Sequence, residues 1–267
     1  MSKKSKPKTA SILNPAQIAV WFASATESMK SEDWQGAIET CQRLLRYLPK
    51  KTSGRAEALA YLGNAYAMQQ EFEAAYQALS EALTITPQDA FLWFNRGLTD
   101  RYLVLLGQSV RDLEKAVSLL QDPTMLRQFK DELKSSEKMA QAELKMRPKG
   151  FTLDQLIEQQ AYFRRGNALM RERKWAEAEQ CFRNAIAMSD CLPNPHGNLG
   201  LCLMMQHRLD EAEAALKRAL EIDKKYDLAK QNLKVLVGVK NGDALPEFRM
   251  SEPFKGKVKG SMSFYQE

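Results

Sequence analysis

The chain has 267 residues, of which 44% are hydrophobic and 27% are charged, a composition typical of a globular protein with a sizeable core. Its formal net charge of +6 is concentrated in the first ten residues, which hold four lysines, and in residues 123–150, with seven basic against four acidic residues. No run approaches the ~20 apolar residues of a membrane span, and four cysteines without a CxxC pair argue against a metal site.

Residues 1–14 form a polar, basic arm that we expect to be disordered. Together with the apolar run "IAVWFASA" at 18–25 they imitate a secretory signal peptide. The apolar run is short, however, and Asn14, Pro15 and Gln17 interrupt it upstream. We therefore expect it to belong to the first helix of the fold and not to a cleaved leader.

Glycines recur at a fixed spacing along the remaining chain, in segments whose composition favours helices and gives almost no strand signal. Gly63 and Gly97 are 34 residues apart, as are Gly166 and Gly200. The gap between Gly97 and Gly166 is longer than two such periods by a single residue. A glycine inside a helix costs about 1 kcal/mol relative to alanine, so its recurrence in register indicates a close approach of two backbones.

Other residue types follow the same period. Alanines recur at two fixed offsets after most of these glycines, as Ala75 and Ala82 do after Gly63, and a bulky side chain recurs at a fixed offset between them. Small residues at fixed points let two successive helices approach, while bulky ones fill the space between them. The bulky positions hold Leu79, Leu113, Phe182 and Leu216. The pattern predicts helical hairpins of 34 residues.

This 34-residue helix-turn-helix pattern resembles the tetratricopeptide repeat (TPR) family. The best match is Leu59-x-x-Leu62-Gly63-x-x-Tyr66, followed by Ala75, Leu79, Ala82 and Pro87. The resemblance implies an all-α fold, namely a right-handed α-solenoid of about five repeats in two blocks plus a C-terminal capping helix. A capping helix is expected because each hairpin buries its face only against a neighbour.

The expected organisation follows from where the repeats begin and end. Residues 124–154 are about one repeat long and look helical but lack the small-residue signature, so we predict a connecting helix there. In chain order we expect a basic arm (1–14), an N-terminal block of three repeats with a degenerate first one (15–123), the connecting helix (124–154), a C-terminal block of two repeats and the capping helix (155–240), and a tail (241–267).

The resemblance also implies a binding surface, because in this family the first helix of each hairpin lines a concave face on which partner peptides lie. Asparagine amides offer both donor and acceptor, so a row of them could hold an extended peptide backbone. Alternatively they cap or bridge neighbouring helices. The matching positions in this sequence hold Asn64, Asn95, Asn167, Asn198 and Asn232.

Some TPR proteins bind the C-terminal carboxylates of heat-shock chaperones with such asparagines and nearby cationic side chains. In this sequence Ala60, Phe163 and Leu228 stand at cationic positions, so the carboxylate clamp is incomplete. Positive charge still lies near the predicted groove, which favours a peptide partner of acidic character. The residues that carry it are Arg101, Arg164 and Arg171.

Four methionines fall on the C-terminal halves of the same helices and allow two interpretations. They are core residues, or they form an adaptable apolar surface that repacks around different partners. These residues are Met68, Met170, Met204 and Met205.

No catalytic constellation is present in the sequence: GxSxG, HExxH, P-loop and GxGxxG motifs are all missing. We therefore expect no enzymatic activity, no metal and no cofactor. Cys41, Cys181 and Cys202 lie within helical patterns as buried thiols would, which fits a reducing cytoplasm.

Two functions remain open at this point. The first is a protein-interaction adaptor that binds an extended peptide or a helix of another protein in the concave groove, with no membrane partner. The alternative is a nucleic-acid- or ribosome-associated factor that contacts phosphates through the basic arm and connector. The arm has no aromatic residue for base stacking, and the repeats themselves are nearly neutral.

Overall fold

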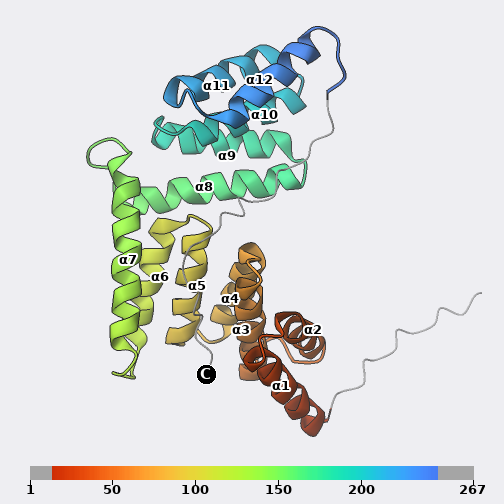
Figure 1. The fold of residues 1–267 in the computed structure, drawn as a ribbon, viewed down its shortest axis with the longest axis vertical. Coiled ribbons are helices and arrows are strands. Elements are labelled where there is room, and N and C mark those ends of the chain that lie inside the picture. Colours follow the sequence, from red (N-terminus) through yellow and green to blue (C-terminus); the bar gives the residue numbers. More distant parts are fainter. Residues whose placement is uncertain (1–13, 246–267) are drawn as a thin grey trace, which may run out of the picture. The chain divides into compact units, whose positions relative to one another are not determined.

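The computed structural model describes residues 14–245, and every regular element in that range is an α-helix (Figure 1). The predicted all-α fold is therefore confirmed. The predicted arm, apart from Asn14, and the tail beyond residue 245 lie outside the described residues. Internal contacts divide the chain within one helix, α7, into a unit 1 that ends at Glu137 and a unit 2 that begins at Lys138. We describe each unit by itself.

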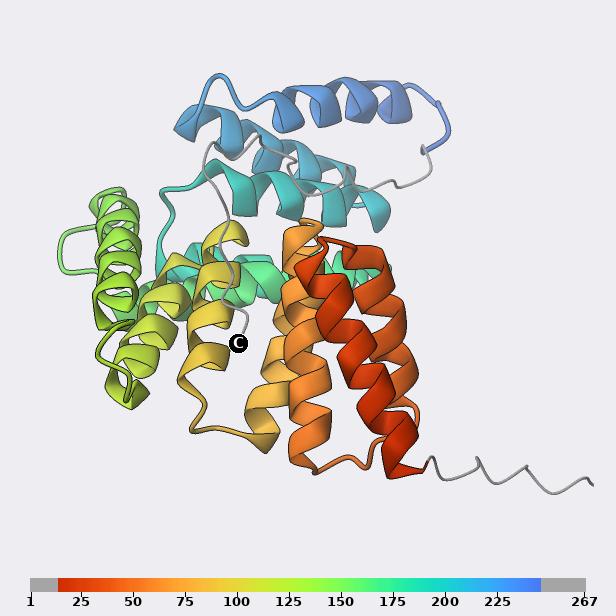
Figure 2. The same ribbon diagram turned by 60° about the horizontal axis from the view of Figure 1, so that its bottom comes forward.

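Unit 1 contains three helical hairpins and the first part of α7. The second helix of each hairpin contacts the first helix of the next, so that α1–α2 and α3–α4 lie side by side (Figures 1 and 2). The helices are α1 (Pro15–Lys30), α2 (Trp34–Leu45), α3 (Ser53–Met68), α4 (Phe72–Ile85), α5 (Ala90–Tyr102), α6 (Leu106–Leu119) and α7 (Leu126–Lys145).

Unit 2 contains the end of α7, two further hairpins and a final single helix. Here too consecutive hairpins contact each other, and the last helix packs on α10 and α11. The helices are α8 (Leu153–Arg171), α9 (Trp175–Met188), α10 (Pro193–Met205), α11 (Leu209–Ile222) and α12 (Asp227–Lys240). The stacking of hairpins in both units is that of an α-solenoid of helical repeats.

The periodic glycines lie where the two helices of a hairpin touch. An ideal Cβ added at Gly63 would lie 2.7 Å from Leu79 Cγ, and one at Gly166 would lie 2.7 Å from the Phe182 ring. The glycine is thus opposed by the bulky residue of the following helix, as the sequence period predicts. The same opposition recurs at Gly97 with Leu113 and at Gly200 with Leu216.

The turn inside every hairpin contains one non-glycine residue in the left-handed region of the backbone. Such a conformation costs an L-residue roughly 1–2 kcal/mol. In each of these turns the backbone N–H of the next residue donates to the carbonyl five residues before it, as Leu105 does to Asp100 at 2.8 Å, so a local helix C-cap hydrogen bond recurs with the turn. The residues, with φ between 58° and 64°, are Glu32, Gln70, Val104, Arg173 and His207.

Two helices begin at a capping box, in which the cap side chain and the third helical residue satisfy each other's backbone. Asn14 and Gln17 form one at the start of α1, and Thr152 and Gln155 form one at the start of α8. As a result α8 begins at Leu153, two residues before the predicted start of the second block.

The first part of α7 packs on the third hairpin of unit 1. The Phe129 ring stacks on that of Phe94 in α5, with centroids 4.0 Å apart, and the hydroxyl oxygens of Ser109 and Ser136 are 2.9 Å apart. The helix predicted as a connector therefore contributes fully buried residues to the end of unit 1. The division into five predicted domains stays a prediction.

Candidate functional site

The predicted asparagines pair across consecutive hairpins. The Asn95 side-chain amide donates to Asn64 Oδ1 at 2.9 Å, joining α5 to α3. The Asn198 amide donates to Asn167 Oδ1 at 2.8 Å, joining α10 to α8. The partners are 31 residues apart in both units. These asparagines therefore bridge neighbouring helices, as one of the two interpretations of the sequence proposed.

The first asparagine pair also borders a groove in unit 1, between α3 and α5. Its volume is about 430 Å³, within the ~300–1,000 Å³ of typical ligand pockets. Asn64 and Asn95 are only 4% and 2% exposed, so they form part of its floor. The lining consists of Ser53, Ala56, Glu57, Ala60, Tyr61, Asn64, Thr86, Asp89, Phe91, Leu92 and Asn95.

Of the eleven lining residues only Asn64 and Asn95 were predicted as site residues. The acidic and aromatic side chains that the prediction missed are those of Glu57, Tyr61, Asp89 and Phe91. Glu57, Tyr61 and Asn64 lie at i, i+4 and i+7 on α3, the spacing of one helix face, and this signal could have identified the first two. Asp89 and Phe91 belong to the start of α5, and they join the groove only because consecutive hairpins stack.

The two carboxylates of the groove are held differently. Asp89 Oδ1 caps α5 by accepting from the backbone N–H groups of Phe91 and Leu92, at 2.9 and 3.2 Å. Glu57 forms no ion pair with any residue of the range 14–245, and burial raises the pKa of its carboxyl. The pKa of the Cys41 thiol is raised to about 12, mainly by burial and in addition by the negative charge of Glu57.

The predicted arginines have different environments. Arg101 is half-buried and its guanidinium pairs with Glu132 of α7 at 2.7 Å. In unit 2, Arg164 is half-buried and Arg171 is exposed in the last turn of α8. The charge of Arg101 is thus neutralised by a partner inside unit 1.

The predicted methionines divide into two kinds. Met170 and Met204 are each 2% exposed and belong to the hydrophobic core of unit 2. Met68 and Met205 are half-buried, so these two of the four predicted methionines have side-chain surface that a partner could contact. Asn232 lies on α12, and its buried amide nitrogen has no hydrogen-bond partner among residues 14–245.

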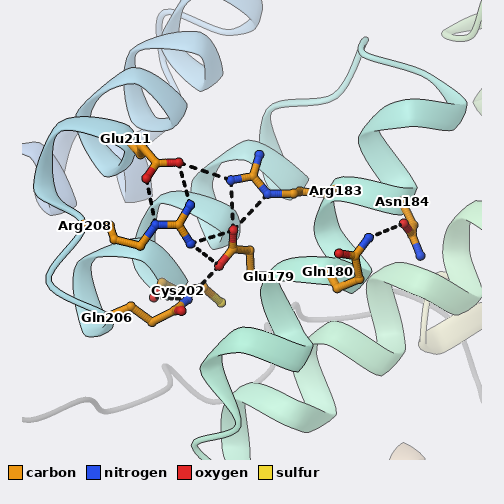
Figure 3. A network of polar contacts seen from close by, with 8 residues as sticks. All are labelled: Glu179, Gln180, Arg183, Asn184, Cys202, Gln206, Arg208 and Glu211. Carbon is orange, nitrogen blue, oxygen red and sulfur yellow. Dashed lines mark hydrogen bonds and ion pairs between the residues drawn. The ribbon is translucent and has the colours of Figure 1, made fainter.

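A polar network in unit 2 joins α9 to the following hairpin (Figure 3). Glu179 accepts from Gln206 at 2.8 Å, from Arg208 at 2.8 Å and from Arg183 at 2.9 Å, and Arg208 also pairs with Glu211. Burial raises the pKa of the Glu179 carboxyl, but these hydrogen bonds outweigh it and lower the pKa overall. The network fixes the turn of the last hairpin. The sequence did not reveal it, because its partners in that turn lie almost a full repeat away from Glu179.

Two classes of site are not found within residues 14–245. No group of three or more His, Cys, Asp or Glu side chains there is arranged to hold a metal ion. None of the helices in that range is both long and apolar enough to cross a bilayer.

Solved structures with similar folds are helical repeat proteins. The TPR domain of Sgt2 from Aspergillus fumigatus is 14% identical, with a TM-score of 0.44, over 51% of this chain and 87% of that one. The TPR2AB domain of yeast Sti1, in a pHSP90 complex, is 17% identical, with a TM-score of 0.39, over 85% of this chain and 86% of that one. A tetratricopeptide repeat protein from Parabacteroides merdae is 18% identical, with a TM-score of 0.40, over 84% and 86%.

Among curated proteins, none matches the sequence significantly. The family model described as "Tetratricopeptide repeat" matches residues 22–90 and 163–227, which together make up half of the chain. These two regions contain the paired asparagines Asn64 and Asn167 and the glycines Gly63, Gly166 and Gly200. The chain belongs to the tetratricopeptide repeat family.

Proposed function

We propose that this protein binds an extended segment or a helix of another protein in the concave groove of its repeats, as a non-catalytic adaptor. The observation that carries the proposal is the groove of about 430 Å³ between α3 and α5, floored by the Asn64–Asn95 pair. Proteins of this repeat architecture commonly mediate protein–protein interactions, and their stacked helices create extended concave surfaces.

Both repeat blocks take part in the proposed binding. Residues 15–123 and 155–240 would each present an asparagine pair to a partner segment, with residues 124–154 as the connector. In the second block Arg164 and Arg171 accompany Asn167 on α8, which favours a segment of acidic character there. Buried thiols such as Cys41 and Cys202 support a cytoplasmic location for the adaptor.

A bulky substitution in the groove tests the proposal better than removal of the asparagines, because Asn64 and Asn95 are buried and hydrogen-bonded to each other. Ala60 is half-buried and lines the groove, so Ala60→Trp should fill it. The matched control is Gln77→Trp, at an exposed position on α4 outside the groove. Circular dichroism should show equal helicity for both variants.

The readout is photo-crosslinking in native extract from a benzophenone side chain placed at position 60 or 77. A partner that is crosslinked from position 60 and not from 77, and that Ala60→Trp loses while Gln77→Trp keeps, supports groove binding. Identical partner sets for both positions and both variants would rule out the groove as the binding surface.

A further inference from the structure

The charged side chains that line the groove of unit 1 are all acidic. The lining contains two carboxylates, Glu57 and Asp89, and no lysine, arginine or histidine. The nearest lysines along the chain, Lys50 and Lys51, are exposed in the link before α3 and do not line the groove. The cations next to the lining residues in sequence, Arg55 and Arg96, are paired with Glu81 and Asp112, so the charges of the groove lining itself are both negative.

Within the described part of the chain, neither carboxylate forms an ion pair with a neighbouring cation. Glu57 has no such partner there, and Asp89 accepts from the backbone N–H groups that it caps. Glu57 is exposed at the rim of the groove, and desolvation by its surroundings raises the pKa of its carboxyl, so that its ionised form is less favourable there than in water. A cation between the two carboxylates would relieve that cost, whereas an incoming carboxylate would increase it.

Two aromatic rings complete the wall of the groove. The Tyr61 hydroxyl is 3.4 Å from Thr26 Oγ1, which fixes that end of the ring. The Phe91 ring meets Phe129 edge to face, with centroids 5.6 Å apart, which fixes the second ring. Aromatic faces attract cations and pack well against the aliphatic stems of lysine and arginine.

We infer that this groove binds a basic peptide segment of a partner protein, with a lysine or arginine side chain between Glu57 and Asp89 and its stem against Tyr61 and Phe91. The inference rests on the proposed function and specifies its ligand for unit 1. It differs from the acidic ligand that the sequence favoured, because Arg101 is paired with Glu132 and the groove itself carries only negative charge.

The test uses the full chain and four pools of nine-residue peptides, acetylated at the N-terminus and amidated at the C-terminus. The central residue of each pool is Lys, Arg, Leu or Glu, and the flanking positions are randomised. Wild-type protein should retain the Lys and Arg pools about fivefold more strongly than the Glu pool, the size expected of a partly exposed ion pair. Retention should weaken in high salt because screening acts on exposed charges.

The variants separate charge recognition from groove binding. Glu57→Gln should remove most of the preference and Glu57→Lys should reverse it. Glu39→Gln, which removes an exposed carboxylate from α2 outside the groove, should leave the preference unchanged. Equal retention of all four pools that Ala60→Trp abolishes would overturn the basic ligand while preserving groove binding.

Two other outcomes also decide against the inference. Retention that Ala60→Trp does not affect, or no retention at all, would contradict the proposed function of this groove together with its ligand. Retention of the basic pools only after removal of residues 1–10 would show that the chain's own lysines occupy the groove, and the partner segment would then be ruled out.

Discussion

Replacing Gly63 by alanine tests whether packing requires the repeated glycine. The new Cβ would lie 2.7 Å from Leu79 Cγ and 2.9 Å from its Cδ2, closer than real contacts allow. Leu79 is fully buried in unit 1, so its side chain cannot turn into solvent. The methyl group must therefore displace Leu79 or separate α3 from α4.

Two opposing effects set the size of the change. Alanine is better than glycine in a helix interior by about 1 kcal/mol. Forcing additional volume into a well-packed core costs about 1–3 kcal/mol. The carbonyl oxygen of Ala75, 3.4 Å from the same Cβ, leaves little room for a compensating shift. The difference between the two effects is about 0–2 kcal/mol, and the lack of room for a shift places Gly63→Ala in the upper half of that range, as a loss of about 1–2 kcal/mol in the free energy of unfolding.

The assay is urea unfolding of the full chain followed by circular dichroism, with the midpoint compared between variants. Gly54→Ala is the matched control, because a Cβ at this position of α3 meets nothing closer than 3.7 Å. It should be neutral or slightly stabilising. Gly63→Ala combined with Leu79→Ala should cost less than the sum of the single changes, since the methyl group then enters vacated space. A midpoint for Gly63→Ala at or above that of the wild type would refute the packing argument.

Three further predictions follow from the turns, the polar network and the thiols. Val104→Gly should raise the thermal midpoint, by about 0.5–1 kcal/mol in stability, because a β-branched residue at φ 60° is strained; a fall in the midpoint would contradict this. Glu179→Gln should destabilise the chain by about 1 kcal/mol at neutral pH. Because the folded-state pKa of Glu179 lies below the ordinary 4.5, its contribution is complete above pH 4.5 and is lost as the pH falls through the folded-state pKa. The difference between wild type and variant in urea titrations should therefore shrink in acid, and a constant difference would exclude the charge as its cause. Cys191, half-buried, should react with a thiol reagent in the native protein before Cys41 and Cys202, whose pKa burial raises to about 12; simultaneous labelling measured by mass spectrometry would contradict this.

The repeats could be predicted because each hairpin depends on contacts between residues at a fixed offset in the sequence. A glycine and the bulky residue that follows it at a fixed offset, such as Gly63 and Leu79, meet in every hairpin that carries this spacing. The offset brings the middle of one helix opposite the middle of the next. The capping box of Thr152 and Gln155 depends on local residues too, but it starts α8 at a point that the 34-residue period does not mark. Helix boundaries are set by such individual caps, which a periodic pattern does not reveal.

The groove could be predicted only in part, because it depends on contacts between hairpins. The family resemblance pointed to Asn64 and Asn95, but the hydrogen bond between them requires the actual register of α3 and α5. Met170 shows a second limit: both sides of a first helix are covered in a stacked repeat, so periodicity does not distinguish core from groove. Glu57 and Asp89 come together for the same reason, through stacking.

The hydrogen bond between Asn64 and Asn95 crosses from one hairpin to the next, unlike the glycine contacts, which lie inside a hairpin. In a linear array of repeats, the folding of each unit is coupled to its neighbour only through their shared interface. These two amide groups therefore help to determine how far a local opening spreads along α3 to α6. A ligand that contacts both amide groups would couple the two hairpins, so that they unfold locally as a single unit. Amide hydrogen exchange should then slow in both hairpins together.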